Sequence, residues 1–345
     1  MDNKIGYVIN IDVGILEKEA MLLMESIIKF VESAPFLIVI KPNLKPLSDS
    51  TMKYFLSKNV HFHELEMENF FPCNIIMSKI FIASYAEELY GETLDYILLL
   101  DNDTMFLNEF ESDLFHMNFS IAARLTDFSD RSLLSFDDCS SIWRYLIDRF
   151  DIGDNPKWKY KCIRDNVIAY ASFNSGFVLE TTKAHLFHKW KAIADYLKND
   201  EKFIDLLNKD MESVHYLDQI LLSLTLMKYF YPENVKILNI RYNFNLESIF
   251  FGRSILFHGQ KWIFKKLPIP IDSLVHIHYH QTFKQRRSLH YFNNDEHVNL
   301  LKSFVPFDNN LNSDKKICRN ILSKAYTFFK FIQYCILRTW NQEAD

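Results

Sequence analysis

The chain of 345 residues is long enough for one large domain or two modest ones, and its 48% hydrophobic content excludes a disordered protein. Only 7 residues are glycine, and neither a GxGxxG turn nor a GxxxxGKS/T loop is present, so a phosphate site must rest on side chains or a metal. The formal net charge of −5 argues against a nucleic-acid partner.

Strand and helix patterns alternate along the first hundred residues. The apolar runs FLIVI and YILLL are typical of strands that are buried on both faces. The alternation predicts an α/β fold with a mostly parallel central sheet flanked by helices. Strands are predicted at 5–11, 36–40, 60–65 and 96–100, and helices at 16–31, 52–57 and 75–90.

The pattern loosens after residue 125. Segment 126–168 is polar, charged and aromatic without a clear register, and we interpret it as an insertion or an acceptor-side lid within a catalytic domain at 1–307. Later strands are predicted at 120–124, 171–179, 235–240 and 274–279, and later helices at 182–197 and 217–230.

The C-terminal segment 308–345 differs in composition from the rest of the chain. Between 315 and 340 it carries six basic residues and no acidic one, with aromatic and aliphatic residues at helical spacing. This pattern predicts an amphipathic helical extension that binds an anionic membrane surface. The alternatives are a helix that docks on its own domain, or an arm that binds protein or nucleic acid.

The cysteines and the apolar runs indicate the compartment. The five cysteines have no CxxC spacing, which favours reduced thiols over a zinc ribbon or a disulfide framework. No signal peptide is recognisable, and no apolar run reaches about 18 residues. We therefore expect a cytoplasmic protein that is peripheral on the inner face of the cytoplasmic membrane if the tail binds lipid.

Two carboxylates directly follow the predicted buried strand 96–100. Asp101 and Asp103 are two residues apart, and Asn102 lies between them as a further candidate for ligand binding. In open α/β sheets, ligands bind beyond the carboxyl ends of the strands. Oxygen ligands favour Mg²⁺ or Mn²⁺, so the motif predicts a metal site, although the same residues also occur in ordinary turns.

Three histidines alternate near the end of the last predicted strand. Because alternate strand residues share a face, His276, His278 and His280 are expected to point the same way. One of them could complete the metal site. In a second interpretation, they are surface imidazoles.

The order of these motifs resembles that of GT-A glycosyltransferases. After the strand and the DxD come Phe173-Asn174-Ser175-Gly176, then Asp218-Gln219 on a helix, then histidine and Lys284. More narrowly, residues 4–285 are similar to glycosyltransferase family 8, which includes glycogenins and bacterial lipopolysaccharide galactosyl- and glucosyltransferases. The resemblance implies a Rossmann-like GT-A domain.

The resemblance also implies roles for individual residues. Asp101, Asp103 and His278 match the family's ligands for Mn²⁺ or Mg²⁺. Lys284 matches the lysine that meets the donor diphosphate, although Gln281 stands where the family has glycine.

For the donor, the family pattern assigns the sugar contacts to Asn174 and Asp218 and places Gln219 below the anomeric carbon. Lys79 matches a basic donor contact on the helix before the DxD. The positions that match the family's base and ribose contacts are Val8, Asn10 and Asp12. The alternatives are a turn-forming Asn174, an Asp218 paired within its helix, and a solvated Lys79.

The resemblance implies the metal-dependent transfer of a hexose from a nucleotide-diphosphate sugar to a glycan or glycolipid. The donor implied is UDP-glucose or UDP-galactose. The acceptor implied belongs to surface polysaccharide or lipopolysaccharide synthesis. The family implies retention of the anomeric configuration. An inverting enzyme would need a carboxylate base, for which Asp137, Asp138 or Asp218 are candidates. A nucleotidyltransferase, a nucleotide-sugar hydrolase and an inactive sugar-nucleotide-binding scaffold are rival functions that the same motifs allow.

Overall fold

The computed structural model describes most of the chain between residues 4 and 304. The described residues are 4–11, 15–42, 46–67, 74–111, 114–116, 118–127, 132–137, 139–162, 167–245, 256–257, 260–261, 270–279 and 294–304. Asp12, Asp138, His280, Gln281 and Lys284 lie outside these ranges. The predicted helical extension at 308–345 lies outside them too, so its membrane role stays a prediction.

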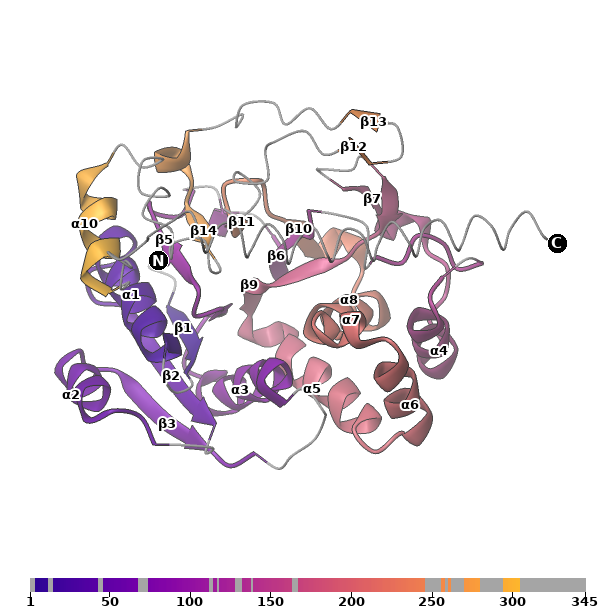
Figure 1. The fold of residues 1–345 in the computed structure, drawn as a ribbon, viewed down its shortest axis with the longest axis horizontal. Coiled ribbons are helices and arrows are strands. Elements are labelled where there is room, and N and C mark those ends of the chain that lie inside the picture. Colours follow the sequence, from indigo (N-terminus) through magenta and orange to yellow (C-terminus); the bar gives the residue numbers. More distant parts are fainter. Residues whose placement is uncertain are drawn as a thin grey trace, which may run out of the picture.

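A seven-stranded sheet forms the centre of the molecule (Figure 1). Its order is β10-β6-β9-β4-β1-β2-β3, in which β9 is antiparallel to both neighbours and every other pair is parallel. The predicted mostly parallel α/β fold is thereby confirmed. The strands are β1 (Ile5–Asn10), β2 (Phe36–Pro42), β3 (His61–Leu65), β4 (Tyr96–Leu100), β6 (Ile121–Leu125), β9 (Phe173–Thr181) and β10 (Val235–Ile237).

Helices bury both faces of this sheet. In β4, Ile97 and Leu99 belong to one core cluster, whereas Leu98 and Leu100 belong to the other, because alternate strand residues point to opposite faces. The first cluster includes side chains from α3 (Asn74–Tyr90), α5 (Leu186–Leu197) and α8 (Leu217–Tyr229). The second includes side chains from α1 (Ile15–Phe30) and α2 (Asp49–Ser57).

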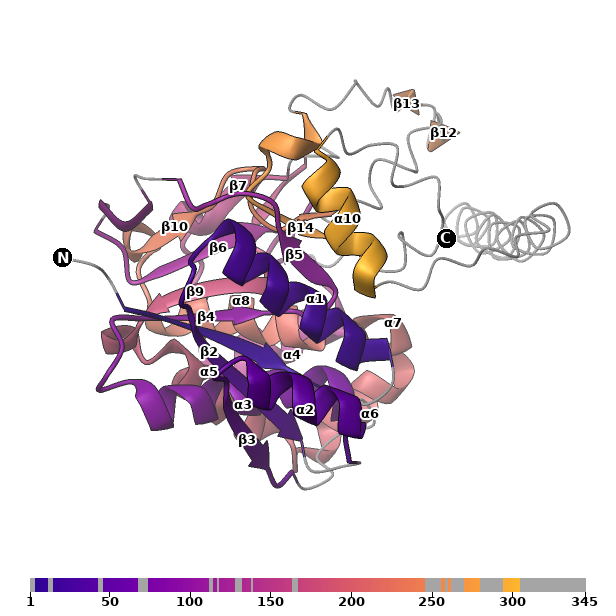
Figure 2. The same ribbon diagram turned by 90° about the vertical axis from the view of Figure 1, so that its left-hand side faces the viewer.

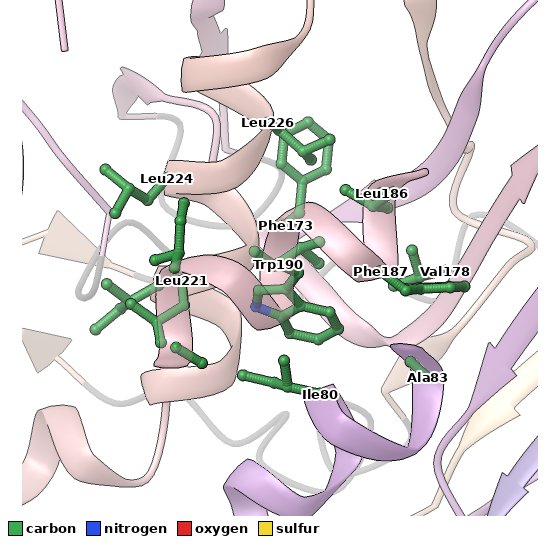
Figure 3. Close-up of a cluster of buried hydrophobic side chains, with 14 of the residues drawn as sticks. Ile80, Ala83, Phe173, Val178, Leu186, Phe187, Trp190, Leu221, Leu224 and Leu226 are labelled. Carbon is green, nitrogen blue, oxygen red and sulfur yellow. The ribbon is translucent and has the colours of Figure 1, made fainter. Parts of the chain in front are cut away.

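The core beneath α3, α5 and α8 is densely apolar around Trp190 (Figure 3). Trp190 is fully buried and is surrounded by aliphatic and aromatic side chains from three helices and from β9. Those drawn include Ile80, Ala83, Phe173, Val178, Leu186, Phe187, Leu221, Leu224 and Leu226. Burial of this apolar surface holds the three helices against the sheet.

A second, three-stranded sheet brings the late part of the chain back to the end of β4. Its order is β11-β14-β5, formed by Phe244–Asn245, His276–His278 and Thr104–Phe106. Helix α10 (Asp295–Phe304) lies beside α1, as Figure 2 shows, and its Leu301 joins the small core of this sheet. Strand β5 starts directly after the DxD motif, Asp101-Asn102-Asp103. The pairing within this sheet therefore determines which residues lie opposite that motif.

Segment 126–168, expected as an insertion or lid, contains structure that the sequence pattern did not predict. Helix α4 (Ser141–Phe150) is capped by Ser140, whose hydroxyl accepts a hydrogen bond from the Trp143 backbone N–H. Its apolar face and Trp158 join the main core. Strands β7 (Lys159–Lys161) and β8 (Ile168–Tyr170) pair antiparallel. The acceptor-side role of the segment stays a prediction.

Further helices follow α5. They are α6 (Glu201–Lys209) and the short α7 (Met211–Val214). Within the described ranges, none of the helices has both the length and the apolar character needed to cross a membrane.

Candidate active site

Two carboxylates and one histidine meet at the carboxyl end of β4. Asp101 and Asp103 occupy the turn between β4 and β5, and antiparallel pairing of β14 with β5 sets His278 opposite Thr104. His278 Nε2 is 2.9 Å from Asp103 Oδ1. One ligand atom from each of the three side chains lies within 4.8 Å of the others. The structure therefore brings together the three residues that the sequence analysis assigned to a metal.

The DxD turn is fixed by backbone contacts. Asp101 N donates to the carbonyl of Gly176 at 3.2 Å, and Tyr279 N donates to the carbonyl of Asp103 at 3.0 Å. The Thr104 hydroxyl donates to the Asp101 carbonyl at 2.5 Å. Strands on both sides therefore fix the backbone of the turn that carries the two carboxylates.

Gly176 leaves the space into which these side chains fit. A Cβ at this position would lie 2.9 Å from Asp101 Oδ2, 3.1 Å from Asn174 Oδ1 and 3.2 Å from His278 Cε1. The first of these distances is shorter than real contacts allow. The requirement for glycine is one of space, since its backbone does not adopt a left-handed conformation.

Lys79 joins the carboxylate turn to helix α8. Its Nζ lies 2.5 Å from Asp101 Oδ1 and 2.9 Å from Asp218 Oδ2, and it donates to the Ser175 hydroxyl at 3.1 Å. Ser175 in turn donates to Asp218 Oδ2 at 2.5 Å. Lys79 is therefore not a solvated lysine, and Asp218 pairs across elements rather than within its own helix.

Burial and charge oppose each other in this cluster. Burial alone would lower the pKa of Lys79, but Asp101 and Asp218 outweigh it and raise that pKa above its ordinary value. Burial would also lower the pKa of His278, but the charge and hydrogen bond of Asp103 raise it. The nearby carboxylates thus favour the protonated form of both Lys79 and His278.

Asn174 is held by partners on two sides. Its Oδ1 accepts hydrogen bonds from Gly176 N at 2.8 Å and from Asn243 Nδ2 at 2.7 Å. Asn243 has a left-handed φ of 45°, and its carbonyl accepts from buried Arg124 at 2.6 Å. Sequence reasoning missed Asn243 and Arg124, because neither belongs to a recognisable motif. Ser175 stands in the Phe173–Gly176 motif, but the motif alone assigned it no role.

The other residues that were predicted to contact the sugar-nucleotide donor lie in different environments. Val8 is fully buried in the core, so its side chain faces other apolar groups. Asn10 donates to Ser78 Oγ at 3.2 Å. The Oδ1 atoms of Asn10 and Asn102 are buried and accept no hydrogen bond from any residue that the structure describes. Gln219 is partly exposed on the first turn of α8, directly after Asp218.

His276 belongs to the core rather than to the metal cluster. Its ring is fully buried, with ring centroids 4.7 Å from Phe106 and 5.0 Å from Phe177. Burial, followed by the charge of His278, lowers its pKa well below the ordinary value, so the ring is neutral. Of the two histidines that the structure describes in this run, only His278 therefore reaches the carboxylates.

The cluster of Asp101, Asp103 and His278 has the composition of a divalent-cation site. Two carboxylate oxygens and one imidazole nitrogen suit Mn²⁺ or Mg²⁺. The convergence of the three ligand atoms and the space left by Gly176 both fit such an ion. The Oδ1 of Asp218 is buried and accepts no hydrogen bond from the residues that the structure describes.

Comparison with known proteins gives one family. A model of the family described as Rhodobacterales glycosyltransferase domain matches residues 7–229. No curated protein sequence matches the chain.

Three of the solved structures that resemble the chain are those of glycosyltransferases. They are the apo structure of the bifunctional glycosyltransferase WbbM (14% identity, 88% of this chain and 52% of that one, TM-score 0.48), apo mouse xyloside xylosyltransferase 1 (14%, 81% and 98%, 0.43), and the galactosyltransferase LgtC with donor and acceptor sugar analogues (16%, 88% and 98%, 0.44). The chain spans about half the length of the WbbM structure.

Proposed function

Because the chain belongs to the Rhodobacterales glycosyltransferase domain family and is therefore a glycosyltransferase, we propose that it transfers a hexose from a nucleotide-diphosphate sugar to a glycan or glycolipid with the help of a divalent cation. The observation that carries this proposal is the convergence of Asp101, Asp103 and His278 at the carboxyl end of β4. In a glycine-poor chain without a phosphate-binding loop, such a site is one way to bind a diphosphate.

The proposed chemistry follows from the charges around the cluster. A bound Mn²⁺ or Mg²⁺ would offset the negative charge that develops on the leaving diphosphate. Lys79 holds Asp101 and Asp218 in place through ion pairs of 2.5 and 2.9 Å. Asp218, whose Oδ1 accepts no hydrogen bond from the described residues, would hold a donor-sugar hydroxyl, with Gln219 next to it in the chain.

The finer assignments rest on the resemblance to glycosyltransferase family 8. It favours UDP-glucose or UDP-galactose as donor, retention of configuration, and an acceptor in lipopolysaccharide or surface-glycan synthesis. The contacts of Asp218 are consistent with retention, since its Oδ2 already pairs with Lys79 and Ser175 rather than standing open as the base of an inverting reaction. Donor contacts through Asp12 and Lys284 are proposed from the sequence alone.

The experiment is product analysis with a panel of nucleotide sugars and acceptors, with Mn²⁺ or with EDTA. We expect transfer that depends on Mn²⁺ and that falls about 100-fold or more in Asp103→Ala, because one ligand of the charge-stabilising ion is lost. Asp195→Ala is the matched control, since its carboxylate pairs with Lys191 and Lys198 on the surface of α5.

The rival activities give different products. Free sugar without transfer would identify a nucleotide-sugar hydrolase, and donor binding without turnover would identify an inactive scaffold. Near-normal activity of a folded Asp103→Ala variant would contradict the metal assignment. Flotation with anionic vesicles, with and without residues 311–345, tests the proposed attachment of the 315–340 segment to a membrane.

A further inference from the structure

A second group of metal-binding residue types lies between α3 and the start of α5. His185 Nδ1 is 2.8 Å from one carboxylate oxygen of Glu87, and His188 Nδ1 is 2.8 Å from the other. One ligand atom from each of the three residues lies within 4.8 Å of the others. Two imidazoles thus converge on one carboxylate.

The exposure of the three side chains forms a gradient. The Glu87 side chain is 1% exposed, whereas those of His185 and His188 are 63% and 46% exposed. The carboxylate is therefore the floor of the cluster, and the two rings stand at its solvent side. An ion from solution can reach all three ligands without unfolding of a helix.

A second buried carboxyl group lies near Glu87. Glu180 on β9 is fully buried, and its Oε2 accepts a hydrogen bond from Leu186 N at 2.7 Å. Its Oε1 is buried and accepts none from the described residues. Burial, followed by the charge of Glu87, raises the pKa of Glu180 well above its ordinary value. Two buried carboxyl groups therefore lie close together at the start of α5.

Helix capping explains only part of this arrangement. His188 N donates to Glu87 Oε2 at 2.8 Å, so Glu87 does satisfy one free N–H of the first turn of α5. Capping does not require either imidazole ring, however. His185 moreover has a left-handed φ of 52°, a conformation that is uncommon for a residue other than glycine.

We propose that Glu87, His185 and His188 form a second metal site, which binds Zn²⁺ and is independent of the Asp101 cluster. Two histidine nitrogens with one carboxylate are a known zinc donor set that leaves a fourth position for water. Glu87 lies on α3, His185 is the residue before α5 and His188 lies on its first turn, and the two helices pack side by side in the apolar core of Figure 3. Zinc bound there would fasten the start of α5 to α3.

The test measures Zn²⁺ in the full chain in an Asp103→Ala background, which removes a ligand of the first cluster. We expect the parent to retain zinc after gel filtration and to lose that zinc when His188→Gln is added. Exposed His215→Gln is the matched control and should retain the zinc. Zinc should raise the melting temperature of the parent and of the control, but not that of His188→Gln.

The outcomes separate this site from the proposed function. Equal zinc content in the parent and in His188→Gln, or no zinc in either, would overturn the second site while leaving sugar transfer untouched. Circular dichroism checks that each variant is folded. If His188→Gln does not fold, His185→Gln gives an independent measurement, because that side chain is mostly exposed.

Discussion

Helix α3 contributes neighbouring residues to two regions of opposite character. Ile80 and Ala83 enter the apolar core around Trp190, whereas Lys79 faces Asp101 and Asp218 at the polar edge of the sheet. In the core, many interchangeable apolar contacts share the stabilisation. At the edge, a few charged groups hold one another in place. The comparison predicts that the core determines stability and that the edge determines activity.

The largest effect on stability is expected in the core. Trp190→Ala removes a fully buried aromatic side chain and leaves a cavity between three helices and β9. We expect it to lower the free energy of unfolding by about 3–5 kcal/mol in denaturant titrations. The activity per folded molecule should stay near that of the wild type. A loss of activity per folded molecule would contradict the claim that the core determines stability and the edge determines activity.

Lys79→Met should lower both stability and activity, because it removes the cation shared by the carboxylates of Asp101 and Asp218. The side chains of Lys79 and Asp218 are 12% and 4% exposed. In EDTA we expect a loss of about 3 kcal/mol in the free energy of unfolding, since a buried carboxylate is left uncompensated. Adding Asp218→Asn should recover part of that loss. No recovery would mean that Lys79 acts through packing alone.

Gly176→Ala tests whether space at the edge is needed. The added methyl group would lie 2.9 Å from Asp101 Oδ2, so the carboxylate must move. We expect a loss of about 1–3 kcal/mol in stability and weaker binding of Mn²⁺. Gly153→Ala is the control, because no atom lies within 4 Å of a Cβ built there. Unchanged Mn²⁺ affinity in Gly176→Ala would contradict the site geometry.

The smallest effect concerns the acid stability of the α4–α6 contact. Burial opposes ionisation of Asp200, but hydrogen bonds from Tyr145 and from Phe203 N, and the charge of Arg149, lower its pKa from the ordinary value of 3.8. The stabilisation is present above that value and is lost as pH falls through the lower, folded-state pKa. Asp200→Asn, which keeps a capping side chain, should cost about 1 kcal/mol at neutral pH and little in strong acid.

A pH-independent difference between the wild type and Asp200→Asn would contradict this account. The measurement is urea unfolding of both proteins across the acid range.

The sequence predicts well the strands that lie in the middle of the sheet, because burial on both faces requires a continuous apolar run. The runs at 36–40 and 96–100 are strands buried on both faces, as expected. Helix α4 was not predicted, although Ser140 and the spacing of Ile142, Trp143, Leu146 and Ile147 are helical signals among polar neighbours.

The candidate site is harder to predict because long-range pairing assembles it. The DxD follows its strand directly, so its place at the sheet edge can be predicted locally. The position of His278 depends on pairing between two strands of three residues each, β5 and β14, far apart in the chain. Asn243 reaches Asn174 from a left-handed position beside a two-residue strand, and no local pattern indicates that.

The most direct test of the account is calorimetric titration of UDP into the wild type and His278→Asn, each with Mn²⁺ and with EDTA. We predict that the wild type binds UDP only with Mn²⁺, and that His278→Asn weakens this binding about tenfold or more while remaining folded. Equal UDP affinity with and without Mn²⁺, or in both proteins, would contradict a metal-dependent donor site at Asp101, Asp103 and His278.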